Sequence, residues 1–141
     1  MKFITELPEN YADLKKAANY TSSWRDRLDA VQALSSYKHE KVIDLLQNRV
    51  KADTVFAVQQ AAFEALTAFG EDVKPPVRRK FELIKGADKV FVRVKKSLPA
   101  DHTISDFAEK LKRMRLDVYD AYEGHHGENF LSWLETKWQS I

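Results

Sequence analysis

Few side chains in this sequence of 141 residues could carry out chemistry. The chain has no cysteine, which excludes disulfides, thiol nucleophiles and cysteine-ligated metals. Adjacent His125 and His126 are the first candidates for a metal site or a general base. Neighbouring residues point in different directions on a helix, so the pair does not gather ligands on one face. We therefore interpret it as part of a solvated turn, Gly124 to Gly127, and predict no metal site.

The motifs of catalysis and of phosphate binding are also missing. There is no Gly-x-Ser-x-Gly nucleophile turn, and the four glycines are too dispersed to bring backbone amides around a phosphate. The acidic pairs Glu71-Asp72 and Asp117/Asp120 are better explained as helix starts and solvated faces than as an acid and base couple. The sequence therefore predicts a protein that is not an enzyme, with no catalytic residues and no cofactor.

Charge is distributed unevenly along the chain. Residues 74–115 carry 13 Lys and Arg against five Asp and Glu, a net charge of +8, whereas both flanks are acidic. Such asymmetry can mark an acidic or nucleic-acid partner, although the same side chains could simply solvate outer helix faces. The candidate anion- or nucleic-acid-binding residues are Arg78, Arg79, Lys85, Lys89, Arg93 and Lys96.

Most aromatic side chains fall on apolar stripes of helical spacing and are expected in the core. Trp133 is the exception, because it lies one position before the predicted buried Leu134. An exposed indole at the edge of a buried face would be a binding anchor.

The elements that must position these residues are organised around a repeat. Two helix-length segments between Trp24 and Gly70 match each other at an offset of about 32 residues, a period typical of stacked repeats. A second helical pattern lies between them, so the repeating unit is predicted to be an antiparallel helix pair. The apolar matches are Trp24/Phe56, Ala30/Ala62, Val31/Phe63, Ala33/Ala65, Leu34/Leu66 and Tyr37/Phe69.

Residues 53–70 resemble the first helix of a HEAT repeat, in particular the short type found in phycobilisome lyases, and the resemblance covers about 24–85. It implies a right-handed α-solenoid that binds other macromolecules. The family usually places an Asp before this helix and an Arg after its first turn. The second segment has Asp53 but Gln59 in the Arg position, and the first has Arg27 but Thr21 in the Asp position. The usual Asp and Arg ladder between repeats is therefore not expected.

The predicted architecture is all-α, with about seven or eight helices in one domain. Low Gly and Pro content argues against a turn-rich β fold. At 89–98 the alternation of Val90, Val92 and Val94 also fits a strand, but helix is favoured because a lone strand has no partner. The expected helices are 8–19, 24–37, a third one ending near Lys51, a fourth capped by Asp53 and Gly70, 75–86 with Val77, Phe81 and Ile84 buried, 89–98, 104–123 with a stripe through Met114, and 128–139 with Leu131, Leu134 and Trp138 buried. Ser23 with Asp26, and Thr103 with Asp106, resemble capping boxes at the starts of the helices 24–37 and 104–123.

The single domain is predicted to span 1–141, with an N-terminal cap at 1–22, repeats at 24–98 and capping helices at 103–141. No apolar run is long enough to cross a membrane, and the first ten residues lack the apolar core of a secretory signal, so a cytoplasmic location is expected.

The leading functional prediction is a non-catalytic protein-interaction or scaffold module. Its partner-binding residues are expected opposite the buried stripe of the third helix, at Asp44, Gln47, Asn48 and Lys51. The alternative is nucleic-acid binding through the basic region 74–115. Neither the partner nor the oligomeric state follows from the sequence.

Overall fold

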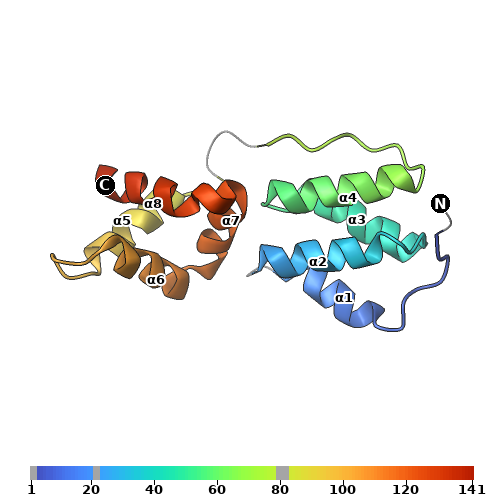
Figure 1. The fold of residues 1–141 in the computed structure, drawn as a ribbon, viewed down its shortest axis with the longest axis horizontal. Helices are drawn as coiled ribbons and strands as arrows, with labels where there is room; N and C mark the ends of the chain where they lie inside the picture. The colour runs from blue at the N-terminus through green and yellow to red at the C-terminus, as the bar shows by residue number, and fades with distance from the viewer. Residues whose placement is uncertain (1–2, 21–22, 79–82) are drawn as a thin grey trace. The chain divides into compact units, whose positions relative to one another are not determined.

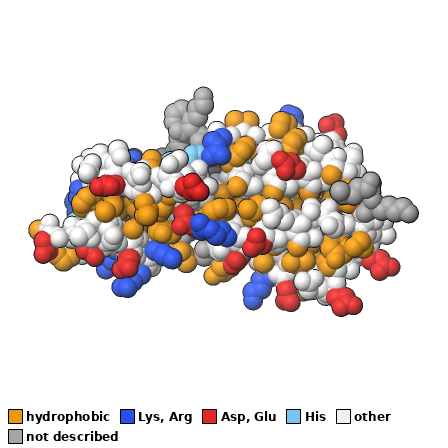
Figure 2. Space-filling model, viewed as in Figure 1, with side chains coloured by type: hydrophobic (Ala, Val, Ile, Leu, Met, Phe, Trp, Pro, Cys, Tyr) orange, Lys and Arg blue, Asp and Glu red, His pale blue; other side chains and the backbone are white. Residues whose placement is uncertain are grey.

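The computed structural model describes residues 3–20, 23–78 and 83–141. Within these ranges all regular secondary structure is helical, and the β-type pairing is an isolated bridge between Ile4 and Tyr37. The prediction of an all-α protein is therefore confirmed. Whereas the sequence predicts one domain, the chain divides into two compact units, Met1–Arg78 and Arg79–Ile141, which we call the N-terminal and C-terminal units (Figure 1). On the face that Figure 2 shows, acidic and basic side chains are interspersed.

The N-terminal unit contains four helices at the predicted places. They are α1 (Tyr11–Ala18), α2 (Trp24–Leu34), α3 (Glu40–Ala52) and α4 (Phe56–Ala68). Helix α1 packs on α2, α3 packs on α4, and α2 and α4 pack on each other. Two predicted caps are present, whereas the N-cap of α4 is Val55 and the predicted cap residue Asp53 instead ends α3. The Ser23 side chain accepts a hydrogen bond from the amide of Asp26, and Gly70 follows α4 with a left-handed φ of +90°.

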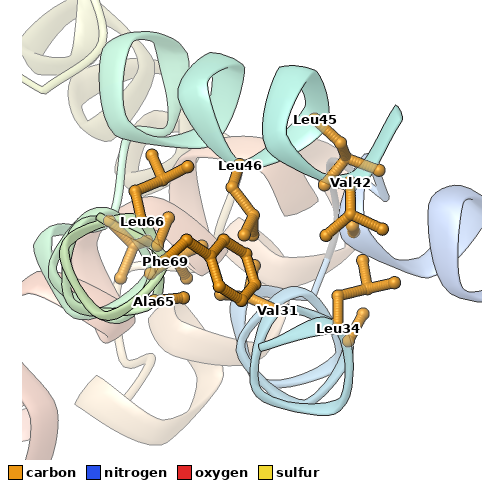
Figure 3. Packing of buried hydrophobic residues seen from close by; sticks show 13 residues of the cluster. Val31, Leu34, Val42, Leu45, Leu46, Ala65, Leu66 and Phe69 are labelled. Atoms are coloured by element: carbon orange, nitrogen blue, oxygen red, sulfur yellow. The ribbon is translucent and has the colours of Figure 1, made fainter. Parts of the chain in front are cut away.

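The core of this unit lies between α2, α3 and α4 (Figure 3). Leu34, Leu46 and Leu66 are completely buried and approach one another from these three helices. Ala30 and Ala62, the small residues that share one position of the two repeating segments, are 2% and 0% exposed. This pair of matched positions therefore lies in the core, where a small side chain lets neighbouring helices approach closely, whereas Ala33, matched to the buried Ala65, is exposed.

The variant Ala62→Leu is expected to overpack the α2–α4 contact. Because Ala62 is fully buried, the added atoms must displace neighbours, and the free energy of unfolding should fall by about 1–3 kcal/mol. Chemical denaturation measures this change. Ala33→Leu in α2 is the control, since Ala33 is exposed and the same enlargement there meets solvent. Equal stability of the Ala62→Leu variant and the parent would contradict the predicted packing.

The C-terminal unit has a core of its own. Its helices are α5 (Ala87–Lys96), α6 (Ile104–Met114), α7 (Leu116–His126) and α8 (Phe130–Ser140), with a 3₁₀ turn η1 (Gly127–Asn129) between the last two. Phe91, Phe107, Leu111 and Leu134 are completely buried in it. The choice of helix over strand at 89–98 is confirmed, with Val90 and Val94 on the buried face of α5.

The single helix predicted at 104–123 is wrong. The backbone leaves the helical region at Arg115, where φ is −143° and ψ is 74°, and this residue separates α6 from α7. Met114, which the predicted stripe buries, is therefore 39% exposed at the end of α6. The break predicted at Gly124 also moves, because α7 continues to His126 and ends at Gly127 with a φ of +57°.

The helix predicted at 75–86 is also wrong over its described first part. Residues 71–78 are non-helical and run as an extended line alongside α4 in Figure 1, so Glu71 and Asp72 start no helix. A residue that precedes proline is driven to extended backbone, and two such positions, Lys74 and Pro75, follow each other here.

Burial along this stretch differs from the prediction as well. Val77 is 81% exposed, and Phe81 lies outside the described residues. Ile84 packs against the core of the C-terminal unit, in the turn that precedes α5. Leu131 of α8, predicted buried, is 61% exposed, whereas Leu134 is buried.

The extended segment, residues 71–78, is held against the N-terminal unit at two points. Val73 packs against its core, and the Arg78 guanidinium lies 4.7 Å from the centre of the Phe56 ring at the start of α4. The segment therefore returns along α4 from its C-terminal end to its N-terminal end.

Candidate partner-binding surface

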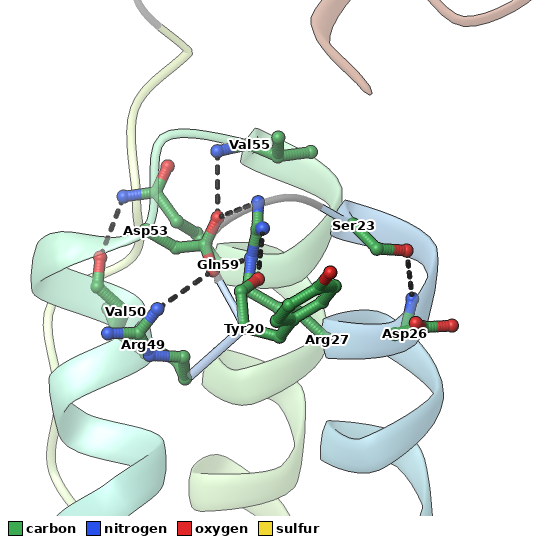
Figure 4. Close-up of polar contacts among 9 residues, drawn as sticks. All are labelled: Tyr20, Ser23, Asp26, Arg27, Arg49, Val50, Asp53, Val55 and Gln59. Carbon is green, nitrogen blue, oxygen red and sulfur yellow. Dashed lines mark hydrogen bonds and ion pairs between the residues drawn. The ribbon is translucent and has the colours of Figure 1, made fainter. Parts of the chain in front are cut away.

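A buried group of charged side chains joins the ends of α2, α3 and α4 (Figure 4). The Arg27 Nε donates to Asp53 Oδ2 over 2.9 Å, and its Nη2 donates to Oδ1 over 3.3 Å. Arg49 Nη1 donates to the same Oδ2 over 3.2 Å, and the Val55 amide donates to Oδ1 over 2.9 Å. Arg27 Nη1 donates to the Tyr20 carbonyl. Two arginines and two carboxylate oxygens thus form a hydrogen-bonded network that compensates for the loss of water.

This network joins the two matched segments. Arg27 comes from the first segment and Asp53 from the second, so the residue that each segment keeps pairs with the one kept by the other. The Gln59 side chain, in the position of the absent second Arg, donates to the Val50 carbonyl over 2.8 Å. Thr21 lies outside the described residues. The departure from the family pattern therefore does not remove an Asp and Arg contact between the two segments.

Helix α3 presents the four predicted partner-binding side chains to solvent. Its buried face carries Val42, Leu45 and Leu46, while Asp44, Asn48 and Lys51 are exposed and Gln47 is half-buried. Arg49 in the last turn of α3 donates its hydrogen bond to Asp53, the C-cap residue of the same helix.

Two grooves, each of about 350 Å³, flank α3. Asp44 and Asn48 line the first, on the side of α1, whereas Gln47 and Lys51 line the second, on the side of the extended segment. The four predicted residues therefore form a ridge between two grooves. The first groove, which we call the α1–α3 groove, is completed by Tyr11, Lys15, Asn19, Lys41 and Leu45, and the second by Val50, Asp72, Val73 and Lys74.

The predicted anion-binding residues do not form a single described group. Arg78 belongs to the N-terminal unit, and Arg79 lies outside the described residues. Lys85, which precedes α5, and three residues of α5 itself are exposed in the C-terminal unit. These three are Lys89, Arg93 and Lys96.

A groove of about 430 Å³ in the C-terminal unit lies between the loop before α6 and α6 itself, and it is lined in part by Asp101, His102, Asp106 and Glu109. The Trp138 indole donates to His102 Nε2 over 2.8 Å. The neutral imidazole therefore carries its proton on Nδ1 and donates it to the Pro99 carbonyl. Both ring nitrogens of His102 are thus engaged in holding the loop and α8.

Asp106 acts as a helix cap rather than as an acid. The Thr103 amide donates to its carboxylate over 3.0 Å, while its own amide donates to Thr103 Oγ1, which confirms the predicted capping box. The hydrogen bonds from the backbone and side chain of Thr103 lower the pKa of Asp106, so its carboxylate is ionised at neutral pH.

The acidic pair on α7 divides into two environments. Asp117 is exposed and accepts from Arg115 over 3.1 Å, and that hydrogen bond lowers its pKa. Asp120 is 5% exposed, so the prediction that it lies on a solvated face is wrong. The sequence could have indicated this burial, because Asp120 lies between Val118 and Ala121, which are both buried. Polar and apolar residues are also not separated onto opposite sides of this short helix.

The histidine pair lies in the last turn of α7 rather than in a turn between helices. His126 stacks on Trp133 with ring centres 4.2 Å apart, and Trp133 stacks on Tyr122 at 5.1 Å. Trp133 is thus packed among aromatic rings and is not an exposed anchor. Glu123 and His126 have a spacing found among helical metal ligands. No group of three or more His, Cys, Asp or Glu that could hold a metal occurs among the residues described.

These features define an all-helical protein with two cores and grooved helical surfaces. Comparisons of the chain with protein-family models, with curated proteins and with solved structures found no match. Over the described part of the chain, every helix falls short of the length and apolar character needed to cross a membrane.

Proposed function

We propose that the protein is a non-catalytic protein-interaction module built on HEAT-like helix pairs, with α3 of the N-terminal unit as its partner-binding element. The observation that carries this proposal is the ridge of Asp44, Gln47, Asn48 and Lys51 with a groove on each side.

The chemistry of the grooves suits a protein partner. Tyr11 and Leu45 give the α1–α3 groove apolar surface, while Lys15 and Asp44 add charges of both signs. Asn48 adds an amide that can donate and accept. A mixture of apolar contact, hydrogen-bonding groups and opposite charges is typical of interfaces between proteins.

The second groove also supports a protein partner for α3. It is lined in part by the chain's own extended segment, through Asp72, Val73 and Lys74, with Val73 packed against the core. Extended backbone is thus already accommodated beside α3. The α1–α3 groove has a similar volume, and we assign it to a partner segment.

The double variant Asp44→Arg/Asn48→Arg tests this proposal. Both side chains line the α1–α3 groove, so two arginines would fill it and replace the acidic Asp44 with a basic side chain. We expect a partner retained by the immobilised parent protein, identified by mass spectrometry, to bind the purified double variant at least about tenfold more weakly, a loss of about 1.4 kcal/mol.

The matched control is Asp29→Arg/Gln32→Arg on α2. Both positions are exposed, the change in net charge is the same, and neither residue lines a described groove. This control should bind the partner like the parent. Equal losses for the two double variants would contradict the assignment of α3, and a parent protein that retains no specific partner would contradict the proposed function itself.

A further inference from the structure

Three basic side chains of the C-terminal unit lie on one face of α5. Lys89, Arg93 and Lys96 follow each other at intervals of four and three residues, which places them on one side of a helix. All three are exposed. Lys85 is also exposed and lies four positions before Lys89. We call these four residues the α5 basic face.

The charges of the α5 basic face are not neutralised within the part of the chain that the structure describes. Other charged groups near α5 are engaged, since Asp88 pairs with Lys137 over 2.7 Å and Lys95 donates to the Trp138 carbonyl. None of the four side chains of the face forms an ion pair with a described residue. Unpaired like charges along one helix repel each other, and an anionic ligand would relieve that repulsion.

The opposite face of α5 is buried, which argues against an anionic membrane as the partner. Val90, Phe91 and Val94 are buried in the core of the C-terminal unit, so the helix has no apolar face left to enter a lipid surface. A basic interfacial helix binds membranes by combining charge with such a face. A solvated polyanion needs only the charges.

We infer that the α5 basic face binds the phosphate backbone of double-stranded nucleic acid without reading its sequence. From Lys89 to Lys96 the helix advances about 10 Å, which is comparable with three axial steps of 3.4 Å between successive phosphates of one strand. No aromatic side chain lies on this face to stack on an unpaired base. The inference concerns the C-terminal unit and does not depend on the proposed role of α3.

The test is the salt dependence of binding to a fluorescent 20-base-pair duplex. Each neutralised phosphate contributes about −0.9 to the slope of log K against log salt, so three or four contacts predict a slope of about −2.7 to −3.6. The triple variant Lys89→Gln/Arg93→Gln/Lys96→Gln should lose about 2.7 units of this slope. Circular dichroism checks that the variant keeps its helices.

The control is Lys110→Gln/Lys112→Gln/Arg113→Gln on α6. It removes the same net charge, but the exposed side of α6 also carries Asp106 and Glu109, so its field is mixed. It should keep most of the slope.

Each alternative outcome overturns the inference. Equal loss in the two triple variants would show attraction by net charge alone. Tighter binding of a single-stranded oligonucleotide of the same length would point to base stacking instead. Binding to phosphatidylserine vesicles without binding to the duplex at about 50 mM salt, where electrostatic binders of nucleic acid bind tightly, would assign the face to membranes. Absence of duplex binding by the parent at that salt would end the inference.

Discussion

Replacing Asp53 by Ala is expected to lower the free energy of unfolding of the N-terminal unit by about 3–5 kcal/mol. Arg27 is 3% exposed, and Asp53 accepts hydrogen bonds from its Nε and Nη2. Without the carboxylate, a buried guanidinium loses its counter-charge, and the buried amide of Val55 loses its acceptor. The cost is large because water cannot replace these contacts in the interior.

Urea unfolding of the parent and the Asp53→Ala variant measures this cost. The control is Asp117→Ala, which removes the partner of Arg115 at the surface, where the two side chains are 40% and 47% exposed. An exposed pair of this kind contributes about 0–1 kcal/mol. If Asp53→Ala cost no more than this control, the network around Asp53 would not stabilise the N-terminal unit as described.

The variant Phe107→Ala is expected to destabilise the C-terminal unit by about 3–5 kcal/mol. The Phe107 ring is completely buried on α6, so its removal leaves a cavity among packed side chains. The matched variant in the N-terminal unit is Leu46→Ala on α3, for which about 2–5 kcal/mol is expected.

Hydrogen exchange of backbone amides locates each loss. Because the two core clusters share no residue, Phe107→Ala should reduce protection in α5 to α8, and Leu46→Ala should reduce it in α1 to α4. Each variant is the other's control. Equal loss of protection throughout the chain in both variants would mean that the two cores unfold as a single cooperative structure.

Local sequence signals predicted the helices of the N-terminal unit well. The spacing of apolar residues in 24–37 and 53–70 shows which side of each helix faces the core. Leu34 and Leu66 lie on that side and are buried in the structure. The caps at Ser23 and Thr103 depend on hydrogen bonds that span three residues. Such features are readable because the residues that decide them are close in sequence.

Features decided over longer distances were not predictable in this way. The Pro75-Pro76 pair fits the first turn of a helix as well as an extended chain, and the packing of Val73 on a distant core favours the extended form. The Arg27–Asp53 pair joins residues 26 positions apart. The resembled family has an Asp and an Arg in every segment, whereas in this chain one residue from each segment is sufficient to form the contact.

The candidate surface on α3 also combines features decided by residues close in sequence with features decided by distant ones. Helical phase correctly predicted that Asp44, Asn48 and Lys51 are exposed, because the buried stripe of the same helix determines it. The grooves beside them depend on α1 and on the extended segment, which no pattern within α3 encodes. The sequence therefore predicted the exposed side chains of the ridge but not the grooves on either side of it.

The extended segment also has the backbone form in which proteases bind their targets. A protease binds its target as an extended strand, and helical backbone must unfold before it can be cut, whereas residues 71–78 already have the required form. Val77, 81% exposed, offers a small aliphatic side chain of the kind that fits the narrow specificity pocket of an elastase-like enzyme. Cleavage after Val77 would release two fragments, each carrying one complete hydrophobic core cluster.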